Sequence, residues 1–135
     1  CAVVLLAVPK TRKTGYAAVL SLIFGVIVTN LLLKNIVARP RPFAEIGALI
    51  PLIAKPTDFS FPSGHTTASF AVALVMLRML PKKIGIPAVV LAALVAFSRL
   101  YLGVHYPTDV LAGFVVALVG SSLAVRGVRT KLGNQ

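Results

Sequence analysis

The sequence predicts an all-α protein, a polytopic bundle of transmembrane helices. Hydrophobic residues make up 58% of its 135 residues and charged residues only 13%, whereas a soluble domain usually carries about 25%. The charges are confined to short segments between long apolar runs. Because a single strand cannot satisfy its backbone hydrogen bonds in lipid, these runs are predicted to be helices. The length allows one domain, so residues 1–135 are expected to form a single membrane-embedded domain.

Four apolar runs are predicted to span the bilayer. Three of them have 18 residues, which reach about 27 Å as an α-helix, close to the thickness of the hydrocarbon core. The run Ala2–Val8 is too short to cross and is interpreted as the tail of a truncated helix, with at least one further helix expected upstream. The four predicted spans are Tyr16–Leu33, His65–Leu80, Ile84–Tyr101 and Thr108–Val125.

The long connection between the first two spans, Pro40 to Pro62, contains the apolar stretch Ile46–Ile53. This stretch is too short to cross a bilayer, so a short interfacial helix or a re-entrant lid is predicted within residues 43–61. Loops of this length usually have a function.

Charge placement predicts the orientation of the bundle. Successive loops alternate sides, and one side receives nine basic residues and no acid, while the other receives all three acids. The positive-inside rule makes the first side cytoplasmic and the second external, which would be periplasmic in a bacterial plasma membrane. With the charges on helix ends, the net charge of +11 favours anionic lipid headgroups over nucleic acid as partner. The nine basic residues are Lys10, Arg12, Lys13, Arg78, Lys82, Lys83, Arg126, Arg129 and Lys131.

Three cations are predicted near the external helix ends: Lys34, Arg41 and Arg99. A guanidinium binds two phosphate oxygens in a planar fork, and lysine contributes a point charge. Together they could bind a doubly charged phosphoryl group. The alternative for each residue is an ordinary interfacial cation whose side chain extends to the water at the membrane surface.

The segment Phe61–His65 is predicted to begin the second span. Ser63 or a neighbour can cap the helix after Pro62, and the first helical amides lack partners within the helix. Helix N-termini bind phosphate for this reason, and Gly64 would let an anion approach the backbone. His65 would then lie beside the bound group, able to donate or accept a proton. A capped helix start with an ordinary histidine is the alternative.

His105 and Asp109 are four residues apart, about one helical turn. The Asp109 carboxylate could accept the proton of one ring nitrogen of His105 and leave the other nitrogen with a free lone pair, as in known nucleophile–base–orienter sets. A helix-capping aspartate beside a satisfied histidine is the alternative. The other polar loop residues are interpreted as solvated charges: Arg39, Glu45, Lys55 and Asp58.

Three segments resemble the signatures of the type 2 phosphatidic acid phosphatase family, a family related to vanadium-dependent haloperoxidases. They are Lys34–Pro42 (KNIVARPRP), Pro62–His65 (PSGH) and Ser98–Asp109 (SRLYLGVHYPTD). All three occur in the order and at the spacing of the family. Its members commonly have six helices, so this chain is expected to lack the amino-terminal part of the family.

The resemblance implies a role for each matching residue. His105 would be the nucleophile, Asp109 its orienting partner and His65 the general acid. The family needs no metal, and no cofactor is expected; Cys1 is the only cysteine, which excludes a thiolate cluster. The phosphoryl oxygens would be held by Lys34, Arg41, Ser63, Gly64 and Arg99.

The expected function is therefore an integral-membrane lipid phosphatase that works through a phosphohistidine intermediate. Its substrate would be a polyprenyl pyrophosphate, phosphatidate or phosphatidylglycerophosphate, with a slight preference for the first. Three alternatives stay open at this point. They are a vanadate-dependent haloperoxidase, which the apolar runs disfavour, a lipid phosphotransferase that uses the same site, and a non-catalytic membrane protein that binds phospholipids.

Overall fold

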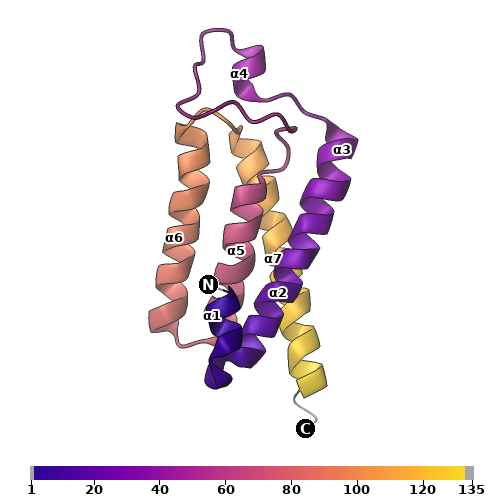
Figure 1. Cartoon of the computed structure of the whole chain (residues 1–135), viewed down its shortest axis with the longest axis vertical. Helices are drawn as coiled ribbons and strands as arrows, with labels where there is room; N and C mark the ends of the chain where they lie inside the picture. Colours follow the sequence, from indigo (N-terminus) through magenta and orange to yellow (C-terminus); the bar gives the residue numbers. More distant parts are fainter. Residues whose placement is uncertain (1, 133–135) are drawn as a thin grey trace.

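The computed structural model describes residues 2–132, and within them the chain is helical without strands (Figure 1). Four long helical segments run along the molecule, and a loop with one helical turn covers one end. The elements are α1 (Ala2–Ala7), the 3-10 turn η1 (Pro9–Thr11), α2 (Arg12–Val26), the π-helical segment η2 (Ile27–Leu33), α3 (Lys34–Val37), α4 (Pro42–Glu45), α5 (Gly64–Met79), α6 (Lys82–Tyr101) and α7 (Pro107–Leu132).

Three helical stretches within the described residues are long and apolar enough to cross a membrane: Pro9–Glu45, Lys82–Tyr101 and Pro107–Lys131. The fourth predicted span, α5, has only 16 residues, which reach about 24 Å. Length and composition thus bear out three of the four predicted spans. The predicted truncated helix corresponds to α1, which packs against α2.

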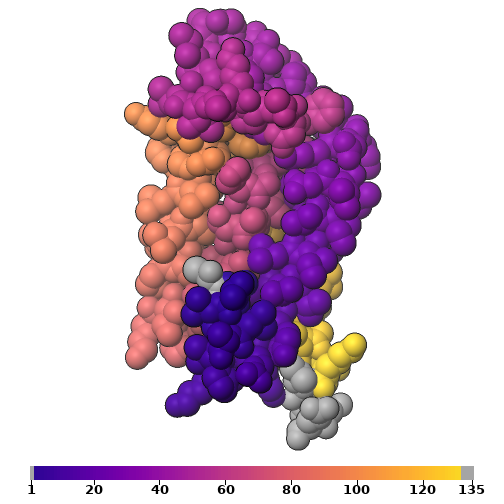
Figure 2. All heavy atoms as spheres, in the orientation of Figure 1, coloured from indigo at the N-terminus to yellow at the C-terminus, as the bar shows by residue number. Residues whose placement is uncertain are grey.

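The interior of the bundle contains many alanines alongside larger residues such as Phe70 and Leu74, whereas many other large apolar side chains face outward. Ala17, Ala18 and Ala71 are completely buried, but Leu91 and Phe97 on α6 are more than 60% exposed. Close packing through small residues is the usual solution when both surroundings and interior are apolar. In the space-filling view, α5 lies in a recess between α2 and α6, below the cap formed by the loop (Figure 2).

α5 is the central helix and contacts α2, α6 and α7. α7 approaches the start of α5 closely at Gly113, where an added Cβ would lie 2.7 Å from the carbonyl oxygen of Ser63. The hydroxyl of Thr67, which also lies beside Gly113, is 3.1 Å from the hydroxyl of Thr29 and ties η2 to α5. These contacts fix the beginning of α5 relative to both neighbouring helices.

The predicted helix within residues 43–61 is present only as the single turn α4, and Ile46–Ile53 is not helical. The expectation of an interfacial helix in that apolar stretch was wrong. Pro51 has no amide to donate and disfavours a helical conformation at Ile50, which explains the interruption. The stretch instead folds over the end of the bundle, where the side chain of Leu49 lies against Gly103.

Candidate active site

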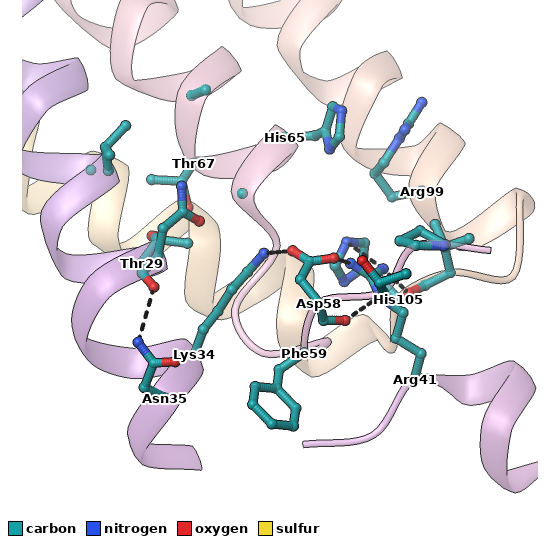
Figure 3. Close-up of a pocket in the computed structure, with 18 of the residues that line it drawn as sticks. Thr29, Lys34, Asn35, Arg41, Asp58, Phe59, His65, Thr67, Arg99 and His105 are labelled. Carbon is teal, nitrogen blue, oxygen red and sulfur yellow. Dashed lines mark hydrogen bonds and ion pairs between the residues drawn. The ribbon is translucent and has the colours of Figure 1, made fainter. Parts of the chain in front are cut away.

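A cavity of about 690 Å³ opens under the loop, at the end of the bundle where α3 and α6 end and α5 and α7 begin (Figures 1 and 3). It collects side chains that are far apart in the sequence. Of the predicted site residues, six line its wall: Lys34, Arg41, Gly64, His65, Arg99 and His105.

His105 lies in the turn between α6 and α7, and its side chain is almost completely buried. Its Nδ1 is 3.5 Å from Oδ2 of Asp109, which is fully buried. The distance is long for a hydrogen bond but places the carboxylate on the Nδ1 side of the ring. Nε2 lies 3.4 Å from Nη1 of Arg41, and because a guanidinium only donates, this arrangement favours the tautomer with the proton on Nδ1. The lone pair of Nε2 then points toward Arg41, which also lines the cavity.

The Asp109 carboxylate has several further donors, so it does not depend on His105 for its hydrogen bonds. The amide of Tyr106 donates to Oδ2 at 2.9 Å, and the hydroxyl of Ser60 donates to the same oxygen. Nη1 of Arg39 donates to Oδ1 at 3.0 Å. A buried carboxylate with this many donors is held in one orientation and stays ionised.

Arg41 is the most firmly held cation of the cavity. It is only 6% exposed, and it donates to the carbonyl oxygens of Val104 and Asp58, each at 2.8 Å. Its Nη2 also donates to the carboxylate of Asp58 at 2.6 Å. The guanidinium therefore lies pre-positioned beside the His105 ring.

The Asp58 carboxylate bridges Arg41 and Lys34, because Nζ of Lys34 binds its second oxygen (Figure 3). Partial burial by itself would raise the pKa of Asp58. The hydrogen bonds and charges of Lys34 and Arg41 outweigh burial and lower that pKa to about 2. A carboxylate of the loop thus occupies the position between two cations where an anionic ligand would bind.

His65 and Arg99 contribute to the same cavity from α5 and α6 (Figure 3). His65 is in the first turn of α5 and is exposed. Nε and Nη2 of Arg99 donate to the hydroxyl of Ser98 at 3.2 and 3.1 Å, which leaves further N–H donors of the guanidinium for a ligand.

Ser63 does not line the cavity wall, in contrast to Gly64. Its buried side chain is the N-cap of α5 and accepts hydrogen bonds from the amide and hydroxyl of Thr66, at 3.4 and 3.0 Å. Its amide donates to the carbonyl oxygen of Asp109 at 3.0 Å. Its role as a phosphate ligand therefore stays a prediction, whereas its capping role is evident from these contacts.

Three residues at this end of the bundle were not predicted as part of the site: Arg39, Asp58 and Ser60. Their partners lie 70, 24 and 49 positions away in the sequence, so no local spacing indicates these contacts. Arg39 and Asp58 are interpreted from the sequence as solvated loop charges; both have charged partners in the structure, while the Asp58 side chain remains half exposed. Within residues 2–132, no group of three or more His, Cys, Asp or Glu side chains is arranged to hold a metal ion.

Residues 15–132 match the model of the PAP2 superfamily, and the chain belongs to this superfamily. It is 37% identical over 122 residues to an undecaprenyl-diphosphatase of Sulfolobus acidocaldarius, covering 90% of this chain and 59% of that protein. The fold is similar to a transmembrane PAP2-type phosphatidylglycerolphosphate phosphatase from Bacillus subtilis, with a TM-score of 0.72, 33% identity and 96% of this chain and 65% of that chain covered. Aquifex aeolicus LpxE has the same fold, with a TM-score of 0.82 at 24% identity, over 93% of this chain and 73% of that chain.

The family resemblance inferred from the three sequence signatures is thereby confirmed. The long apolar helices and the transmembrane relative identify an integral membrane protein. The chain spans little more than half the length of the curated relatives it matches, between 55% and 59% for three of them.

Proposed function

We propose that this chain carries the active site of a lipid phosphatase that transfers a phosphoryl group first to His105 and then to water. The observation that supports this most strongly is the arrangement of His105. Asp109 lies on the Nδ1 side of the ring, and Nε2 lies 3.4 Å from Arg41, one of the cations that line the cavity. A neutral imidazole oriented by a carboxylate is a competent nucleophile.

The proposed reaction has two in-line displacements. In the first, Nε2 of His105 forms a bond to phosphorus while the bond to the leaving oxygen breaks, and His65 donates a proton to that oxygen. In the second, water attacks the phosphohistidine and the P–N bond breaks, while His65 takes a proton from the water. Asp109 compensates the positive charge that His105 carries as phosphoimidazole.

The cations would stabilise the charge on the non-bridging phosphoryl oxygens, which is usually the largest contribution to phosphoryl transfer. Lys34, Arg41 and Arg99 surround one cavity, and the amide of Gly64 begins α5 without a partner inside the helix. Because Asp58 bridges two of these cations, a phosphoryl group has to displace or accommodate its carboxylate.

For the substrate, we propose a membrane lipid with a terminal phosphate or pyrophosphate. The similarity to an undecaprenyl-diphosphatase favours a polyprenyl pyrophosphate, and the similarity to a phosphatidylglycerolphosphate phosphatase keeps a glycerophospholipid as the second class. Both classes of lipid carry a phosphoryl group at the end of a long apolar chain, and we propose that the site binds this group.

For the topology, we propose that residues 1–135 form one domain with four spans, and that the cavity opens on the external side of a bacterial plasma membrane. Both the basic charges and the placement of the cavity support this orientation, since the start of α6 and the end of α7, where basic residues gather, lie at the opposite end of the bundle from the loop (Figure 1). α5 would cross despite its 16 residues, because its first turn lies below the loop and need not reach the surface.

The proposal is tested by measuring phosphate release from a panel of lipid phosphates in EDTA, with the purified protein in detergent. His105→Ala should abolish release, whereas Lys55→Gln, a charge change on the same loop but outside the cavity wall, should leave the rate unchanged. Activity of His105→Ala at the level of the parent would rule the proposal out. An added acceptor alcohol distinguishes hydrolysis from transfer, because a transferase would produce a new phosphorylated product.

A further inference from the structure

Asp109 is held from two directions by the segments on either side of the loop that covers the site. Arg39 belongs to the outgoing segment, just after α3, and Ser60 to the returning segment, just before α5. Arg39 binds Oδ1 of Asp109 at 3.0 Å, and the Ser60 hydroxyl donates to Oδ2, the oxygen that also faces His105. The two segments are joined directly, since the amide of Ser60 donates to the carbonyl oxygen of Arg39 at 2.9 Å.

The ion pair of Arg39 differs from an ordinary surface salt bridge, which contributes little. Its partner Asp109 is completely buried. The guanidinium also lies 3.8 Å from the ring centroid of Tyr106 and donates to the hydroxyl of Thr108 at 2.7 Å. These contacts hold the guanidinium in one place, so the charge of Arg39 acts on Asp109 with a fixed geometry.

Ser60 is also completely buried, and its hydroxyl is 3.5 Å from Nδ1 of His105. Because its proton goes to Oδ2 of Asp109, the serine oxygen keeps that carboxylate oxygen pointing at the ring. Neither Ser60 nor Arg39 lines the cavity, so neither is placed to touch a phosphoryl group.

We propose that Arg39 and Ser60 are positioning residues for the nucleophile. They fix the Asp109 carboxylate, and through it the orientation and tautomer of His105. This inference rests on the proposed function, because it assigns a role within the same reaction. The two ends of the loop over the site would therefore supply hydrogen bonds to Asp109, the residue that orients His105.

The test uses Arg39→Gln and Ser60→Ala, with Lys55→Gln and Ser122→Ala as matched controls on the loop and on α7. Each site variant should lower kcat about ten- to hundredfold, as expected for the loss of one hydrogen bond to a charged group. KM should stay unchanged, because the cavity wall is intact. Arg39→Lys retains the charge and should recover a large part of the rate that Arg39→Gln loses.

A second measurement separates positioning from a merely structural role. The chain has two histidines, so a ¹⁵N-histidine NMR spectrum contains two rings, which His65→Gln assigns. The His105 ring should show the Nδ1–H tautomer in the parent protein and in both controls, and a mixture of tautomers in Arg39→Gln and Ser60→Ala.

Parent-like kcat in both site variants, or an unchanged His105 spectrum together with equal rates for Arg39→Lys and Arg39→Gln, would overturn the inference. If Arg39→Gln fails to fold, the positioning role is tested with Ser60→Ala and Arg39→Lys, because each of these substitutions alters the side chain less. His105→Ala, measured in parallel, distinguishes a failure of the proposed function from a failure of the positioning role. If it is active, the proposed function itself fails, whereas an inactive His105→Ala beside fully active Arg39 and Ser60 variants contradicts only the positioning role.

Discussion

The guanidinium of Arg41 donates to the carboxylate of Asp58 over 2.6 Å inside the cavity. The second oxygen of that carboxylate binds Lys34, so one carboxylate of the loop is paired with two of the cations that the proposed reaction needs. An incoming dianion therefore competes with a carboxylate of the protein. This relationship leads to the first two predictions.

Asp58→Asn should bind anions more tightly than the parent protein. Sulfate is a suitable probe, because it keeps two negative charges over the accessible pH range. Its inhibition constant should fall about two- to fivefold, the equivalent of one partly exposed ion pair. Glu45→Gln is the matched control, because Glu45 accepts a hydrogen bond from the Tyr106 hydroxyl and does not line the cavity. Equal inhibition constants for Asp58→Asn and the parent would show that the carboxylate does not compete.

The contribution of Asp58 to stability should depend on pH in a defined window. Its pKa in the folded protein is about 2, below the ordinary value of 3.8. A depressed pKa means that the ion pairs stabilise the fold fully above about pH 4, and that this stabilisation is lost as the pH falls toward 2. Thermal unfolding of the parent and of Asp58→Asn in detergent should give a constant difference in Tm from pH 8 to pH 5. The difference should shrink at lower pH, and a difference that grew on acidification would contradict the assignment.

His65→Gln should slow turnover in a way that depends on the leaving group. A general acid typically contributes about 10²- to 10⁴-fold, and it matters least when the leaving oxygen needs no proton. We therefore expect a large loss of kcat/KM with an alkyl phosphate and a much smaller loss with p-nitrophenyl phosphate. A loss of the same size with both substrates would remove His65 from this role.

Gly113 should tolerate no side chain. An added Cβ would lie 2.7 Å from the carbonyl oxygen of Ser63, at the beginning of α5. Gly113→Ala should therefore lower Tm and reduce activity together, because the first turn of α5 has to shift. Gly127 on the same helix meets nothing within 4 Å, so Gly127→Ala should leave Tm unchanged or raise it slightly, as alanine favours a helix by up to about 1 kcal/mol. Equal Tm values for the two variants would contradict this packing.

The helical fold could be predicted because lipid leaves the apolar runs no alternative to helices. Pro62 and Ser63 also indicated where α5 begins, and the structure confirms the cap at Ser63. The fold of Ile46–Ile53 could not be predicted from its length and hydropathy. There Pro51 interrupts the helix, and the contact of Leu49 with Gly103 is a tertiary one.

The composition of the cavity wall was largely predictable as well. Lys34, His65 and Arg99 had to meet because alternating helices bring their external ends together, and all three line the cavity. The outer contacts could not be predicted. Arg39 and Ser60 contact Asp109 only once the loop has folded back over the bundle. The position of Asp58 likewise depends on its ion pairs with Lys34 and Arg41.

Direct detection of the phosphohistidine is the most decisive measurement for the proposed reaction. A ³²P-labelled lipid phosphate is mixed with the protein and quenched in alkali within one turnover, and the labelled peptide is then identified by mass spectrometry. The phosphoryl group should be found on His105, with none retained in His105→Ala, and the label should disappear at the rate of phosphate release. Turnover without label on His105, or label on another side chain with the same kinetics, would contradict the account.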